Sequence, residues 1–80
     1  MQRITADTFS KQDKPVQVQW LRTLGKHLGN RQFEGYLVSL FAVEDFYVEL
    51  WKRVGLDYID YIEVVRDDTR LALYVPKLDL

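Results

Sequence analysis

Cysteine is missing from this 80-residue sequence, proline occurs only twice and glycine four times, and no long apolar run is present. Without cysteine the chain has neither disulfides nor thiolate metal ligands, a composition that suits a reducing compartment. No run approaches the ~18 consecutive apolar residues of a membrane-spanning helix. Residues 1–7 also lack the apolar segment of a secretory signal. We therefore expect a cytoplasmic protein that makes no use of a membrane.

Histidine is almost absent too. His27 is the only one, so a single chain cannot assemble a site of several histidines. The glycines, at positions 25, 29, 35 and 55, match neither a phosphate-binding loop nor a dinucleotide fingerprint. Glu49 and Glu63 could form a catalytic carboxylate pair, but a hairpin alone encloses no cleft, and the pair more simply keeps an aromatic surface soluble. We expect no enzymatic activity, no cofactor, no metal site and no small-molecule substrate.

An excess of either charge is also lacking, because eleven basic and twelve acidic residues leave a net charge of −1. Six basic and three acidic residues nevertheless give +3 in residues 1–40, and five and nine give −4 in residues 41–80. The basic half holds Lys11, Lys14, Arg22, Lys26 and Arg31 around Trp20. This pattern supports an alternative function as a nucleic-acid-associated protein. The net charge argues against it, because nucleic-acid-binding domains are usually basic as a whole.

The length corresponds to one domain, residues 1–80, of a size at which association often supplements a small core. Residues 1–13 are polar except for Ile4 and Phe9. Two alternatives follow for this segment: a flexible arm, or a stretch that those two side chains hold against the fold.

Residues 15–28 have the period of an amphipathic helix. The apolar stripe consists of Val16, Trp20, Leu24 and Leu28. Asp13 suits the N-cap and Pro15 the first turn, while Gly29-Asn30 is a good stop signal. The sequence therefore predicts a helix over residues 15–28.

Residues 31–43 fit two secondary structures. A helical stripe is formed by Phe33, Tyr36, Leu37, Leu40 and Phe41, whereas residues 36–43 are also a short apolar run typical of a strand. We favour the strand, because Gly35 would weaken a helix interior. A tight turn at Glu44-Asp45 would then pair this strand directly with the next one. The helix is kept as the alternative.

Residues 46–51 and 58–65 predict a hairpin. If paired residue numbers summed to 109, Glu49 would face Asp60, and like charges opposite each other destabilise a sheet. An even sum, 108 or 110, removes this conflict. Gly55 supplies the positive φ that a three-residue loop requires.

Beyond residue 65, an aspartate at position 67 or 68 can cap a short helix. Its apolar residues are Leu71, Tyr74 and Val75, and Pro76 ends it. The predicted fold is α+β: an N-terminal helix, a three-stranded antiparallel meander and a short C-terminal helix. If residues 31–43 were helical, the fold would instead be two helices, one hairpin and a helix.

Both faces of this meander would be apolar, although an antiparallel sheet generally buries one face and leaves the other in water. The first face holds Leu37, Phe41, Val43, Phe46, Val48, Leu50, Ile62 and Val64, with Ser39 and Asp60. The second face holds Tyr36, Val38, Leu40, Ala42, Tyr47, Trp51, Ile59, Tyr61 and Val65, with Glu49 and Glu63.

Three environments are possible for the second face. It packs against the N-terminal helix while the C-terminal helix covers the first face, it is half exposed, or it is an interface. We favour the interface, because Tyr and Trp are enriched at interfaces and large exposed apolar patches are rare on monomers. The predicted interface residues are Tyr36, Tyr47, Trp51, Ile59 and Tyr61. The predicted function is a non-enzymatic interaction module, either a homodimer or an accessory subunit bound to a protein partner.

Residues 36–80 contain an ordered series of structural segments. The series is Phe46-Tyr47-Val48-Glu49-Leu50-Trp51, then Ile62-Glu63-Val64, then Leu71 and Tyr74. It resembles a group of short uncharacterised bacterial proteins in which an aromatic-Val-Glu-x-aromatic strand precedes a second strand and a short capped helix. The resemblance concerns structure alone and implies a bacterial source.

Overall fold

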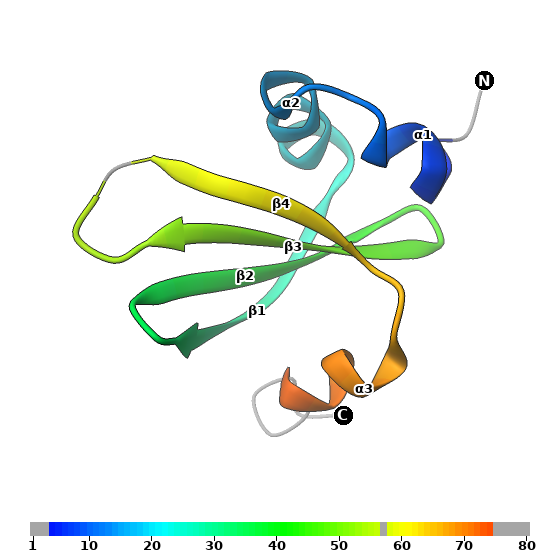
Figure 1. The fold of residues 1–80 in the computed structure, drawn as a ribbon. Helices are drawn as coiled ribbons and strands as arrows, with labels where there is room; N and C mark the ends of the chain where they lie inside the picture. Colours follow the sequence, from blue (N-terminus) through cyan, green and yellow to red (C-terminus); the bar gives the residue numbers. More distant parts are fainter. Residues whose placement is uncertain (1–3, 57, 75–80) are drawn as a thin grey trace.

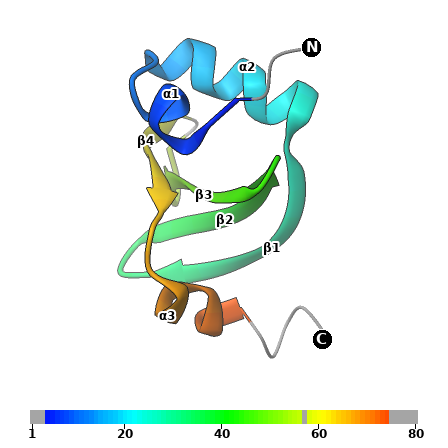
Figure 2. The same ribbon diagram turned by 90° about the vertical axis from the view of Figure 1, so that its right-hand side faces the viewer.

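The computed structural model describes residues 4–56 and 58–74, which form one four-stranded antiparallel sheet with helices on both faces (Figures 1 and 2). The elements are α1 (Ala6–Ser10), α2 (Lys14–Leu24), β1 (Lys26–Phe33), β2 (Tyr36–Val43), β3 (Phe46–Arg53), β4 (Ile59–Val65), α3 (Asp68–Leu71) and the 3-10 helix η1 (Ala72–Tyr74). The strand order is β1-β2-β3-β4. The α+β class is confirmed, whereas the three-stranded meander is wrong.

Strand β1 is the element that the sequence prediction missed, because the helix predicted over residues 15–28 ends at Leu24. Gly25 has an extended backbone, and a Cβ there would lie 2.6 Å from the carbonyl oxygen of Leu21. The next hairpin explains why a polar segment becomes a strand. Glu34 and Gly35 both have positive φ, 47° and 86°, as the favoured two-residue hairpin turn requires. Pairing with β2 therefore creates β1.

Strand β2 confirms the preferred interpretation of residues 36–43 and excludes the helical alternative. A two-residue turn at Glu44-Asp45 joins it to β3, with Val43 opposite Phe46. Glu44 takes a positive φ of 51° in this turn. The predicted tight turn and the direct pairing of the two strands are therefore both confirmed.

The β3–β4 pairing has the predicted even parity, but it is shifted, because Trp51 faces Tyr61 and the paired numbers sum to 112. Gly55 has the predicted positive φ of 89°, in a loop longer than three residues. Between Trp51 and Lys52 the register shifts, since Lys52 faces Ile59 and Asp60 is the extra residue of a β-bulge. Because of the bulge, Ile59 lies on the first face of the sheet, whereas we had placed it on the second face.

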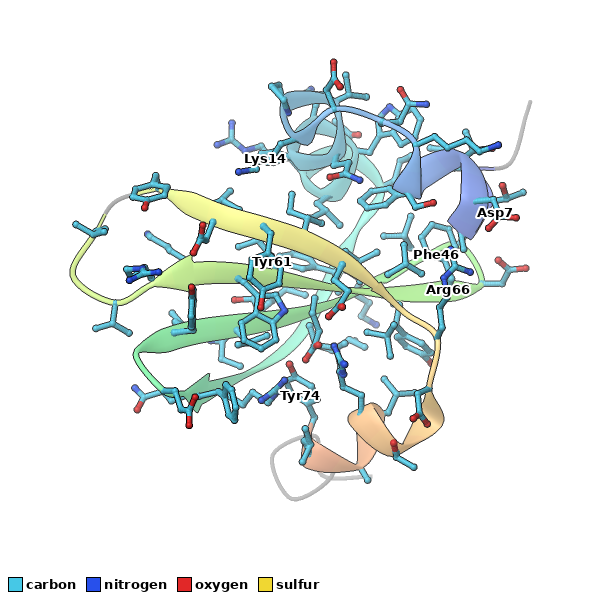
Figure 3. The ribbon with its side chains drawn as sticks, viewed as in Figure 1. Asp7, Lys14, Phe46, Tyr61, Arg66 and Tyr74 are labelled. Carbon is cyan, nitrogen blue, oxygen red and sulfur yellow. The ribbon has the colours of Figure 1, made fainter. Side chains whose placement is uncertain are left out.

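One cluster of the hydrophobic core lies between the first face and the two N-terminal helices. Its buried residues are Phe9, Leu21, Val43, Phe46 and Val48. Figure 3 shows Phe46 directly under α1. The helix α2 therefore covers the first face, and the C-terminal α3 lies on the opposite face (Figure 2). The first of the three possible environments had the N-terminal helix on the second face and the C-terminal helix on the first face, so the observed arrangement is the reverse.

Helix α1 fixes the N-terminal segment. The Thr5 side chain accepts a hydrogen bond from the backbone N–H of Thr8 and caps the helix. Phe9 is fully buried and Ile4 packs against the same cluster. Gln17 Nε2 donates a 2.9 Å hydrogen bond to the Phe9 carbonyl and thereby ties α2 to α1. Residues 4–13 thus follow the second alternative, a segment held by Ile4 and Phe9.

The C-terminal turn begins as predicted. The Asp67 side chain accepts a 3.0 Å hydrogen bond from the backbone N–H of Thr69, so Asp67 is the N-cap of α3. This bond is also the main reason why the pKa of Asp67 is lowered. Tyr74 is fully buried at the end of η1. Val75 and Pro76 lie outside the described residues.

Candidate functional site

An aromatic cluster occupies one end of the second face. We use this name for Phe33, Tyr36, Trp51 and Tyr61. Tyr61 stacks on Trp51 with ring centroids 5.0 Å apart and planes inclined by 17°, while Tyr36 and Phe33 meet Trp51 edge-on at 5.4 and 6.1 Å. Each such pair adds about 0.5–1.5 kcal/mol to the burial of its surface. The four rings therefore form one packed unit.

Exposure within this cluster is uneven. Trp51 is only 6% exposed, whereas Phe33 and Tyr61 are 47% and 41% exposed. Trp51 forms the floor, and Phe33 and Tyr61 present their rings to solvent above it. The buried Trp51 Nε1 has no hydrogen-bond acceptor in the described part of the chain, so the contacts of the indole ring, and not a hydrogen bond, hold this side chain there.

Arg31 connects the aromatic cluster to a buried carboxylate. Its guanidinium carbon lies 5.2 Å from the Trp51 ring centroid and 5.7 Å from that of Phe33. Its Nε donates a 3.2 Å hydrogen bond to Glu49 Oε2. A planar, weakly hydrated cation suits both an aromatic face and a carboxylate. Arg31 is thus held on two sides.

Glu49 is the centre of what we call the carboxylate cluster, namely Glu49, Glu63, Arg31, Arg70 and Tyr74. Its side chain is inaccessible to solvent. Oε1 accepts a 2.9 Å hydrogen bond from Arg70, and Oε2 accepts one of 2.5 Å from the Tyr74 hydroxyl besides that from Arg31. Both oxygens are therefore satisfied, as a buried carboxylate requires.

Arg70 also resolves a conflict in the sheet. The observed register places Glu49 directly opposite Glu63, a like-charge pair that destabilises a sheet when it stands alone. The same Nη1 atom of Arg70 donates to both carboxylates. The hydrogen bond to Glu49 is the largest cause of the raised pKa of Arg70. The pKa of Tyr74 is raised chiefly by burial and then by its hydrogen bond to Glu49. The C-terminal turn is thereby fastened to the second face, on the side where Figure 3 shows Tyr74.

The Asp60 bulge builds a polar edge on the aromatic cluster. The Tyr36 hydroxyl donates a 2.7 Å hydrogen bond to Asp60 Oδ2. Arg53 Nη2 donates to the Tyr36 oxygen at 2.9 Å and lies 3.4 Å from Asp60 Oδ2. The hydrogen bond from Tyr36 is the main cause of the lowered pKa of Asp60, and the same bond raises the pKa of Tyr36. Asp60 had been assigned to the first face, and its bulged position explains the difference.

The structure brings three of the five predicted interface residues together. Tyr36, Trp51 and Tyr61 belong to the aromatic cluster. Tyr47 lies towards the other end of the second face, where it pairs with Ala42 and Val65. Ile59 belongs to the first face, so its assignment to the interface surface is wrong.

The sequence prediction missed Phe33, Arg31, Arg70 and Tyr74 as members of this region. Phe33 and Arg31 lie in a strand that was not predicted. Arg70 and Tyr74 lie in a segment that only one of the three alternatives placed, and that alternative put it on the first face. A usable signal was present, because Glu49 is the only charged residue in an otherwise apolar strand core from Phe46 to Trp51. A carboxylate at such a position requires a cationic partner from elsewhere in the chain.

The basic residues of the N-terminal half are not all on one surface, since Lys14 and Arg22 line one depression beside α2 and Arg31 lies on the second face of the sheet. Arg31 belongs to the carboxylate cluster. Lys14 Nζ donates to the backbone carbonyl oxygens of Ile59 and Asp60, at 3.1 and 2.8 Å. Trp20, the candidate stacking residue, packs against the hydrophobic core.

Within residues 4–56 and 58–74, no group of three or more histidine, cysteine or acidic side chains is arranged to hold a metal ion. Over the same residues, no helix has the length and apolar character needed to cross a membrane. Comparison with protein-family models, with curated proteins and with solved structures finds no match for this chain.

Proposed function

We propose that this chain is a small, non-enzymatic interaction module that forms a homodimer through the aromatic cluster. The observation that carries the proposal is the exposure of Phe33 and Tyr61 on top of the buried Trp51. Aromatic residues and arginine supply most of the binding energy at protein interfaces, above all when they surround a well-packed centre. The cluster has this composition and this layering.

A second copy is the favoured occupant because the edge of the cluster carries both charges. Arg53 and Asp60 lie beside Tyr36, and Glu63 and Arg70 belong to the neighbouring carboxylate cluster. A two-fold axis brings the same patch of two subunits together in opposite directions. A patch with adjacent positive and negative groups can then satisfy its own charges, whereas a patch of one sign would repel its copy.

The two clusters also support the proposal through rigidity. Arg31 is fixed by Glu49 and by the rings beneath it, and Tyr36 is fixed by its hydrogen bond to Asp60. Side chains that are already immobile lose little conformational entropy when a partner binds. The proposal includes a cytoplasmic location and a bacterial source, which rest on the absence of cysteine and on the resemblance stated above.

Sedimentation velocity over a wide range of concentrations tests the homodimer. We expect Tyr61→Glu to shift the equilibrium to monomer, because it places a carboxylate beside Glu63 and removes a ring from the interface. Tyr58→Glu is the matched control, since Tyr58 is 53% exposed and lies outside the cluster. A wild-type chain that stays monomeric at every concentration would refute the proposal. So would a folded Tyr61→Glu variant, checked by circular dichroism, that dimerises like wild type.

A further inference from the structure

Strand β4 is the last strand in the sheet order, so one of its sides has no neighbouring strand in the described part of the chain. The pairing pattern shows which backbone groups point to that side, because bonded and non-bonded positions alternate in an antiparallel pair. The 2.8 Å bond from the Val54 N–H to the Gly35 carbonyl oxygen fixes the alternation in β3, and the β3–β4 register then places Glu63 among the positions bonded to β3. Ile62 and Val64 therefore direct their N–H and C=O groups outwards.

The outward side of β4 is open along residues 62–64. A depression with a volume of about 420 Å³ runs beside these residues and is bordered by α1 and α3. Figure 2 shows β4 at the side of the sheet, with α1 and α2 at one face and α3 at the other. The start of the strand is occupied, because Lys14 Nζ donates to the carbonyl oxygens of Ile59 and Asp60. A further strand can therefore pair with β4 beyond Asp60.

We propose that the homodimer forms by antiparallel pairing of β4 with β4 of a second copy, about a two-fold axis at Glu63. With the axis there, Ile62 of each copy faces Val64 of the other, and their outward N–H and C=O groups satisfy one another. An axis at Ile62 would instead require the Asp60 carbonyl oxygen, which already accepts a hydrogen bond. An axis at Val64 would extend the pairing to Arg66, beyond the end of β4. The pairing rests on the proposed homodimer and specifies how its two copies meet.

The charges along β4 suit antiparallel alignment with a second copy. Asp60 lies at the start of the strand and Arg66 follows its end, so opposite charges of the two copies meet. Arg66 now binds Asp7, but both side chains are mostly exposed, and such a surface ion pair contributes little. Glu63 faces its own copy, a contact that is unfavourable between isolated charges. Each Glu63 keeps its ion pair with Arg70, which offsets this repulsion.

Tyr61 is the residue at which the aromatic cluster reaches this edge. In the pairing about Glu63 it stands opposite Val65 of the second copy, on the second face. Val65 pairs with Tyr47 within its own sheet, so Tyr47 lies one strand further from Tyr61 of the second copy. Phe33 belongs to β1, the opposite edge strand, and stays outside the contact.

A single introduced cysteine tests the position of the axis, because the chain has no cysteine of its own. Glu63→Cys should form an interchain disulfide under mild oxidation, since directly opposite residues at such a non-bonded position have Cα atoms about 4.5 Å apart, within the roughly 4.4–6.8 Å of disulfides. Non-reducing electrophoresis measures the dimer. Gln32→Cys is the matched control, because Gln32 is an exposed residue of the other edge strand, and it should remain monomeric on the gel.

Two further variants separate the edge pairing from the homodimer itself. Val64→Pro removes an outward N–H at a position where an edge strand tolerates proline, so it should be a folded monomer by circular dichroism and sedimentation velocity. Gln32→Pro, the matched control, and Phe33→Glu should still dimerise. A wild-type dimer whose Glu63→Cys variant crosslinks no faster than Gln32→Cys would overturn the edge pairing and leave the homodimer standing. So would loss of the dimer in Phe33→Glu but not in Val64→Pro. A wild-type chain that is always monomeric would overturn both.

Discussion

Replacement of Glu49 by glutamine is expected to lower the free energy of unfolding by about 3–5 kcal/mol, the usual result when one partner of a buried ion pair is removed. The glutamine side chain has nearly the shape of glutamate, so the core should keep its packing. Its amide carries no charge and has only one acceptor oxygen. It therefore cannot accept from Arg70 on one atom and from Arg31 and Tyr74 on the other, as Glu49 does.

The size of this effect follows from the burial of each partner. The Arg31 side chain is only 13% exposed, and Glu49 is the only carboxylate paired with it among the described residues. Arg70 is 35% exposed and keeps its ion pair with Glu63. Most of the loss should therefore come from Arg31. A domain of this length has a total stability of about 4–12 kcal/mol, so the variant would lose a large fraction of it.

Urea unfolding followed by circular dichroism measures this loss. With a slope of about 1 kcal/mol per molar urea, the midpoint should fall by about 3 M or more. Glu63→Gln is the matched control, because Glu63 is 43% exposed and its replacement should cost less than about 1 kcal/mol. Measurements at several protein concentrations separate folding from association. Equal losses for Glu49→Gln and Glu63→Gln would refute the reasoning.

Three further predictions concern single contacts. Tyr36→Phe should raise the pKa of Asp60 towards its ordinary value of about 3.8, as measured by carbon NMR titration of the carboxyl group. Since a lowered folded-state pKa stabilises the fold above the unfolded-state pKa, the variant should also lose less stability as pH falls through the acid range. Glu34→Asn should raise the melting temperature by a few degrees, because Asn tolerates the positive φ and precedes Gly in the preferred turn. Lys14→Met should increase concentration-dependent light scattering, because two carbonyl oxygens of the edge strand β4 lose their donor.

Each of these three predictions has a matched control. Tyr47→Phe removes a hydroxyl on the same face and should leave the pKa of Asp60 unchanged. Glu34→Ala removes the same side chain without favouring positive φ, so a gain equal to that of Glu34→Asn would contradict the turn argument. Lys11→Met adds the same apolar side chain at an exposed position, and equal scattering from both variants would mean that the edge strand is not responsible.

Local patterns predicted the centre of the sheet well. The apolar run of residues 36–43 and the turn at Glu44-Asp45 determine β2 and its partner, since both signals lie within a few residues of each other. The Asp67 cap was predictable from its residue type. In each case the residues that determine the feature are close together in the sequence. The parity of the β3–β4 register agrees with the prediction, but charge repulsion does not explain it, because the observed register places Glu49 opposite Glu63.

The errors of the sequence prediction occur where contacts between residues far apart in the sequence determine the structure. The segment of β1 contains Gly29 and Asn30 and has little strand propensity, so only its pairing with β2 makes it a strand. The bulge at Asp60 cannot be recognised from the alternation of apolar and polar residues. It places Ile59 on the first face and not on the second. The partners of Glu49 are 18 to 25 residues away in sequence, in segments whose own patterns do not identify them.

The strand order β1-β2-β3-β4 has a consequence for how the protein folds during synthesis. Each strand pairs only with its neighbour in sequence, and such local pairing forms quickly. The contacts that seal the first face are far apart in the chain: Lys14 reaches β4 across 45 and 46 residues, and Asp7 reaches Arg66 across 59. Because a ribosome releases the N-terminal part first, α1 and α2 must wait for β2 and β3, which supply Val43, Phe46 and Val48 of the core, and then for β4. Until then the apolar sides of both helices face solvent or a chaperone.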